Sequence, residues 1–179
     1  MISADTSVSV RPTVATAVDR QPELFEVRPA AREQLLDAFG GSSGATGGEG
    51  RFGLWTRRGG AIVRARRASF EPWLPAGGAA VRRLDVTLAS VAIERLAGID
   101  PSAVAEGRIA FTMDAAEAIA WVDAGAAPTG GQPASAALLL DPTPASEIVA
   151  VAADGDVMPQ KSTYIYPKAL TGLVINPLE

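Results

Sequence analysis

A pair of adjacent glycines between two short runs of alternating residues limits the fold of this chain more than any other feature. The runs are RFGLWT (residues 51–56) and AIVRAR (residues 61–66), and Gly59-Gly60 lies in the turn between them. Glycine readily adopts the positive φ angles that tight hairpin connections need. Alternation along the second run places its arginines on one face with Ile62, and Val63 on the other. The pattern therefore predicts a β-hairpin around which the remaining elements are arranged.

The rest of the chain alternates strand-like and helix-like patterns. Apolar runs of strand length occur at residues 24–27, 108–113, 136–140 and 172–178. Helical periodicity occurs at residues 29–39, 85–97, 114–124 and 144–153. Two segments rich in glycine or proline, residues 40–50 and 68–80, predict loops, the first of them flexible.

These patterns predict the fold class α/β (α+β): a mixed β-sheet with about four helices packed on it. At 179 residues, the chain is long enough to bury a core and fits a single domain. We expect that domain to span residues 22–179. Residues 1–21, rich in Ser, Thr and Val, are expected to form a flexible N-terminal tail.

Local signals predict how the helices begin. The expected capping residues are Asp85, Asp114 and Thr143, and the prolines expected in first turns are Pro29 and Pro144. In the last helix, the periodicity predicts that Ile148, Val149 and Ala152 face the core.

The chain contains neither cysteine nor histidine. This composition excludes disulfides, thiolate or imidazole metal sites and a Ser-His-Asp triad within the chain. A magnesium site made only of carboxylates remains open. The first residues do not resemble a secretory signal and no run is long enough to span a membrane, so we expect a cytoplasmic protein without membrane partners.

Charge is distributed unevenly along the chain. Residues 51–83 contain eight arginines and one acid, Glu71, and carry +7, so the remainder carries −11 of the total −4. Such a segment can bind an anionic partner such as RNA, with Arg64 and Arg66 as the residues to test. However, aromatic residues are few near these arginines, with Trp55 the one next to the turn, so a solvated hairpin face, or pairing with the chain's own acids, is the preferred interpretation.

The segment MPQKSTYIYPK (residues 158–168) contains both lysines and both tyrosines of the chain. It is not a phosphate-binding loop of the Walker A type, because Gln160 stands where that loop needs glycine and because a helix precedes it. Alternation places three hydroxyl residues on one face: Ser162, Tyr164 and Tyr166.

Two ammonium groups and several hydroxyls in one extended segment can bind a phosphate or a carboxylate. The candidate ligand-binding residues are Lys161, Ser162, Thr163, Tyr164, Tyr166 and Lys168. In the alternative interpretation, the tyrosines cover the core and the lysines are solvated. Asp141 ends a predicted central strand and is a further candidate ligand or base, or else a polar turn residue before Pro142.

The C-terminal half resembles the closing block of the family called domain of unknown function 1015, found in bacteria and archaea. The resemblance rests on the Leu-rich run 138–140, Pro142-Thr143-Pro144, the whole of residues 158–168 and Thr171-Gly172-Leu173. Ile165 departs from the family, which often has an aromatic residue there. A looser match in the order of elements extends the resemblance to about residues 50–179.

The resemblance implies a C-terminal portion of a longer protein, because the family's preceding half carries an Ala-Asp-Gly-His-His-Arg block and this chain has no histidine. It implies a chain that is not catalytic in isolation and that works with a missing N-terminal half or as a homo-oligomer. A second implication is part of a nucleotide-dependent small-molecule kinase, with a nucleotide or phosphate as ligand. Separately, we predict no metal-binding residues. The richness in alanine and arginine suggests an actinobacterial source.

Overall fold

The hairpin forms around Gly59, which adopts a φ of 126°. Its strands are β2 (Arg51–Thr56) and β3 (Gly59–Ala65), paired antiparallel with Thr56 opposite Gly59. The computed structural model of the chain describes residues 18, 20–40, 48–99, 106–126, 133–159 and 162. The other elements are β1 (Phe25–Ala30), α2 (Arg32–Phe39), α3 (Arg67–Phe70), η1 (Glu71–Trp73), α4 (Ala79–Arg83), α5 (Asp85–Ala97), α6 (Ala115–Ala124), β4 (Ala136–Leu140) and α7 (Ala145–Ala153).

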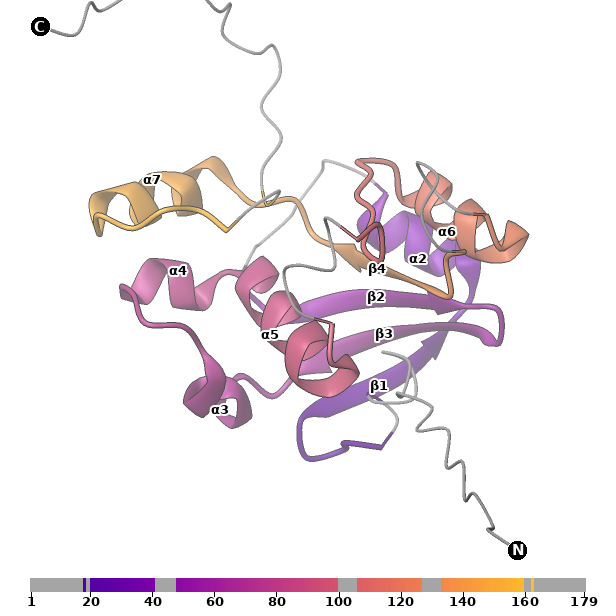
Figure 1. Ribbon diagram of the computed structural model, residues 1–179, viewed down its shortest axis with the longest axis horizontal. Helices are drawn as coiled ribbons and strands as arrows, with labels where there is room; N and C mark the ends of the chain where they lie inside the picture. Colours follow the sequence, from indigo (N-terminus) through magenta and orange to yellow (C-terminus); the bar gives the residue numbers. More distant parts are fainter. Residues whose placement is uncertain are drawn as a thin grey trace, which may run out of the picture.

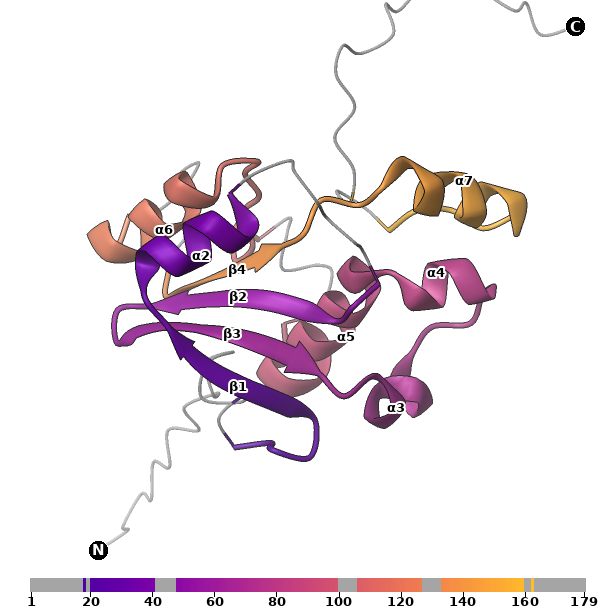
Figure 2. The same cartoon turned by 180° about the vertical axis from the view of Figure 1, so that it is seen from behind.

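The four strands form one sheet in the order β1-β3-β2-β4. Residues 136–140 were expected to form a central strand, but β4 lies at an edge of the sheet that the described strands form. Figures 1 and 2 show this sheet between two helical layers, with α5 on one face and α2 and α6 together on the other. The predicted fold class, one α/β domain with helices packed on a single sheet, is confirmed. All three described pairings are antiparallel, rather than the mixture of directions that we predicted.

Each face of the sheet has its own core. On the α5 side, Phe52, Leu54 and Val63 of the hairpin pack with Leu88 of α5. The α2–α6 side has a separate core, whose fully or nearly fully buried residues are Leu35, Phe39, Ile119, Val122, Ala137 and Leu139. Ile62 packs against this second core, so the predicted alternation along β3 is confirmed.

All four predicted helices are present, but their starts differ from the prediction. Asp114 does cap α6, since its carboxylate accepts hydrogen bonds from the backbone N–H groups of Ala116 and Glu117. Pro29 lies in β1, not in a helix, because an edge strand tolerates a residue without an N–H donor. α5 and α7 have no side-chain cap, and Asp85 and Thr143 bind other parts of the chain instead.

Two loop and strand predictions were wrong. Residues 68–80 were expected to be a loop, but they include most of α3, all of η1 and the start of α4. Residues 108–113 were expected to be a strand, but they form none. The end of that run instead organises the start of α6, where the Thr112 hydroxyl donates to Glu117 and accepts from the backbone N–H of Asp114.

The buried face of α7 also differs from the prediction. Val151 is 1% exposed, whereas Val149 is 67% exposed and Ala152 is exposed. The reason is that α7 packs beside α4, against Val81 and Leu84, and not on the sheet (Figure 1). The face of α7 that is buried is therefore the one that meets this small third core, and not one that meets the sheet.

Some predictions fall on residues that the structure does not describe. The predicted strand at residues 172–178 lies entirely outside the described residues, as does most of the predicted tail at residues 1–21 and most of the loop at residues 40–50. Within the tail, Val18 is described and lies in the core at 5% exposure. None of the helices in the described ranges is long and apolar enough to cross a membrane.

Candidate functional site

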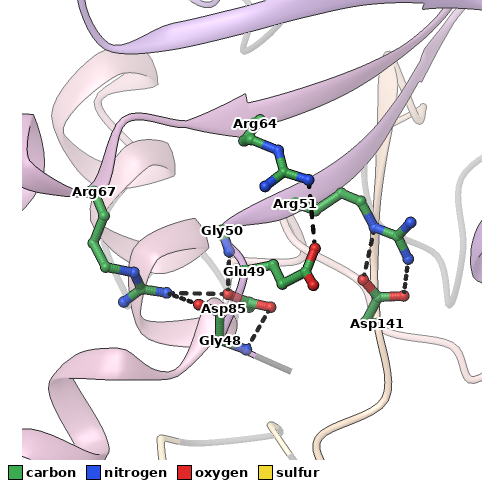
Figure 3. Close-up of polar contacts among 8 residues, drawn as sticks. All are labelled: Gly48, Glu49, Gly50, Arg51, Arg64, Arg67, Asp85 and Asp141. Carbon is green, nitrogen blue, oxygen red and sulfur yellow. Dashed lines mark hydrogen bonds and ion pairs between the residues drawn. The ribbon is translucent and has the colours of Figure 1, made fainter. Parts of the chain in front are cut away.

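A cluster of ion pairs lies at the end of the sheet where β2 begins and where β3 and β4 end (Figure 3). Its charged members, here called the strand-end cluster, are Glu49, Arg51, Arg64, Arg67, Asp85 and Asp141. Antiparallel pairing brings these residues together from distant parts of the sequence, because the start of one strand adjoins the ends of its neighbours. Three guanidinium groups face three carboxylates, so the cluster balances its own charge.

Asp85 is the most deeply buried acid of this cluster, at 6% exposure. Its carboxylate accepts hydrogen bonds from the backbone N–H of Gly50 at 2.7 Å and of Gly48 at 3.0 Å, and from the Arg67 guanidinium at 3.3 Å. Both glycines have positive φ angles, 76° at Gly48 and 65° at Gly50, which let two nearby N–H groups point at one carboxylate. Burial raises the pKa of Asp85 above its ordinary value, although these hydrogen bonds oppose the shift.

The sequence pattern did not reveal this role of Asp85. The pattern predicted a helix cap, whereas the carboxylate holds the end of the loop that precedes β2. The one available signal was a pair of glycines at the end of residues 40–50, and it does not identify a partner 35 residues away.

The predicted site residue Asp141 lies in the cluster. Arg51 donates to it through Nε at 3.0 Å and through a terminal nitrogen at 2.8 Å, a two-bonded arrangement that suits the planar guanidinium. The Asp141 side chain is 8% exposed, and its hydrogen bond raises the pKa of Arg51 above its ordinary value. The Arg51 guanidinium also lies over the Phe39 ring, 4.9 Å from its centre. Asp141 thus ties β4 to β2, which favours a structural role over that of a free base.

Glu147, in the first turn of α7, lies near this cluster, and its pKa is raised by burial and by the nearby negative charge of Asp85. A carboxyl with a raised pKa binds its proton more tightly in the folded than in the unfolded protein. Its protonation therefore adds stability as the pH falls through that pKa, and this contribution is lost as the pH rises again.

We predict that the free energy of unfolding of the wild type, relative to Glu147→Gln, increases as the pH is lowered from neutral into the range where Glu147 protonates. Urea denaturation of both proteins at several pH values measures this difference. A difference that decreases on acidification would contradict the raised pKa.

Of the other predicted ligand-binding residues, the structure describes only Ser162. Its hydroxyl donates to the carbonyl oxygen of Pro159 at 2.5 Å, and its own carbonyl oxygen accepts from the Thr143 hydroxyl at 3.4 Å. Lys161, Thr163, Tyr164, Tyr166 and Lys168 lie outside the described residues. Within the motif, Ser162 therefore lies beside Thr143, two residues beyond Asp141.

Several arginines of the hairpin and of the residues after it contact acceptors within the chain. Besides the pairs already described, Arg64 contacts Glu49 at 3.4 Å, Arg57 donates to the Val122 carbonyl at 3.2 Å and Arg66 donates to the Pro22 carbonyl at 3.3 Å. These contacts support the interpretation that this positive segment pairs with its own chain.

Two further acids, Asp154 and Asp156, hold the start of α4. They accept from the backbone N–H groups of Ala80 at 3.1 Å and of Gly78 at 2.6 Å.

Within the part of the chain that the structure describes, no three acidic side chains are placed to hold a metal ion. A shallow groove of about 210 Å³ lies beside the β2–β3 turn and contains none of the predicted site residues.

Comparisons with protein-family models, curated proteins and solved structures found no match to this chain.

Proposed function

We propose that this chain is a C-terminal portion of a cytoplasmic protein similar to the family called domain of unknown function 1015, and that residues 161–168 form one wall of a phosphate-binding site. The opposite wall would come from a missing N-terminal half or from another copy of the chain. In this proposal, the chain is not catalytic in isolation.

The proposal is carried by the composition of residues 158–168, together with the hydrogen bond that places Ser162 beside Thr143. The only two lysines of the chain occur there, with four hydroxyl side chains between them. An ammonium group is a compact charge with three donors, and hydroxyls add further donors to phosphate oxygens.

The neighbouring strand-end cluster supports the proposal indirectly. Arg51 already donates to Asp141 through two nitrogens, so its guanidinium is not a free anion-binding group. The Thr143–Ser162 hydrogen bond joins the start of the lysine segment to a part of the fold that ion pairs already hold in place. A binding group on a well-supported element loses less entropy when its ligand binds.

Thermal unfolding with inorganic phosphate, phosphoserine, ADP and ATP tests the proposal. A ligand at 100 times its Kd adds about 2.7 kcal/mol of stability, and about 2–4 °C is expected for each kcal/mol in a chain of this size. We therefore predict a rise in Tm of at least about 5 °C for a ligand that binds, lost in Lys161→Gln.

The matched control is Arg58→Gln, which removes one positive charge from an exposed position at the hairpin turn. It should keep the full shift if Lys161 holds the ligand at a specific site. A general attraction of anions to positive charge would instead weaken binding equally in both variants. Shifts with ADP and ATP alone would favour the kinase alternative over a simple phosphate site. No shift with any of the four probes, or equal losses in the two variants, would refute the proposal.

A further inference from the structure

The two edges of the sheet are protected very differently. β1, at one edge, has the charged residues Glu26 and Arg28 and the donor-free Pro29, which discourage pairing with another strand. β4, at the opposite edge, reads AALLL and contains no charge and no proline. Open, uncharged edges of this kind are normally covered in native proteins, because they pair readily with other strands.

Within the described residues, β4 pairs only with β2 (Figure 1). Successive residues of an antiparallel strand direct their N–H groups alternately toward one neighbour and toward the other. Some N–H and C=O groups of β4 therefore point away from β2, where no described strand meets them. On the α5 side, Ala136, Leu138 and Leu140 are only half-buried, which leaves apolar surface beside this open edge.

The chain returns to the carboxyl end of β4 after α7. The Thr143–Ser162 hydrogen bond places Ser162 beside Thr143, which lies three residues beyond Leu140, the last residue of β4. A segment that continues from Ser162 along β4 must run antiparallel to it, because it starts at the end where β4 finishes. No linker is needed, and the covalent connection gives the segment a high effective concentration at this edge.

Residues 163–167, TYIYP, suit this position. The segment has as many residues as β4 and is rich in the β-branched and aromatic residues that favour strands. Pro167 would end the ladder, since it has no N–H to donate. We propose that residues 163–167 of this same chain pair antiparallel with the open edge of β4, as a fifth strand of the sheet.

This pairing does not require anion binding, but it would give the proposed phosphate site a defined backbone. Lys161 and Lys168 would then flank the new strand, and alternation would place the tyrosines together on one face. The pairing and the phosphate site can fail separately, because the first is measured without any ligand.

Amide hydrogen exchange of the full chain, followed by NMR, tests the pairing. We expect the β4 amides that do not donate to β2 to be protected in the wild type. Ile165→Pro removes one N–H from the proposed strand, and we expect it to lower their protection at least 10-fold. Ile165→Ala keeps the N–H and should leave most of the protection.

The matched control is Ile175→Pro, which makes the same change in the predicted strand at residues 172–178. It should leave β4 protected if residues 163–167 are the partner. Three results would each overturn the proposal. The first is loss of protection in this control instead of in Ile165→Pro, and the second is a lack of protection of the outward β4 amides in the wild type. The third is protection that depends on protein concentration, as expected for edge pairing between two copies.

Discussion

Replacing Phe70 with alanine is expected to lower the free energy of unfolding by about 4 kcal/mol, the usual cost of removing a fully buried aromatic ring. Phe70 has no exposed surface. Its ring lies edge-on to the rings of Phe25 and Trp73, with centres 5.4 Å and 5.7 Å away. It therefore joins β1, η1 and the α5-side core, and its removal leaves a cavity that several elements would have to fill.

The conservative variant Phe70→Leu separates loss of packing from loss of the fold. It keeps most of the apolar volume, so we expect a cost of about half that of alanine. Urea denaturation followed by circular dichroism measures both variants without relying on the fluorescence of Trp73. A cost below about 1 kcal/mol for Phe70→Ala would mean that α3 and η1 are not part of the cooperative core.

The failure to predict this region from sequence has a simple cause. α3 has four residues and η1 has three, so neither is long enough to show a helical period, and the surrounding prolines and glycines favour a loop. Phe70 is buried because Phe25, Trp73 and the rest of the α5-side core pack around it, and these contacts form only when the chain folds. The longer helices were predicted well, since α2, α5 and α6 each extend over enough turns to show an apolar stripe facing the sheet.

The limits of sequence analysis at α7 and at the strand ends are of another kind. An apolar stripe shows that a helix buries one face, but α7 has apolar residues all round, and its position beside α4 decides that Val151 is buried. The same holds for Asp141. Its place at the end of β4 was predicted, but its pairing with Arg51 follows from the order of strands in the sheet, which local patterns do not specify.

Replacing Asp85 with alanine is expected to lower the free energy of unfolding by about 3 kcal/mol, because removing one partner of a buried ion pair leaves the other charge uncompensated, and two backbone N–H groups also lose their acceptor. The groups affected are the N–H donors of Gly48 and Gly50 and the guanidinium of Arg67. The raised pKa of Asp85 does not contradict this cost. It shows that burial opposes the charged form, whereas the variant removes the acceptor altogether.

Asp37→Ala is the matched control, since Asp37 is an exposed acid on α2, and we expect it to change stability by less than about 0.5 kcal/mol. The double variant Asp85→Ala with Arg67→Met tests the pair itself. Removing both charges leaves no unpaired guanidinium, so the double variant should be more stable than the sum of the single losses predicts. Strict additivity would show that Asp85 acts through the two glycine N–H groups alone, and that Arg67 is held by its bonds to the carbonyl oxygens of Gly48 and Arg82.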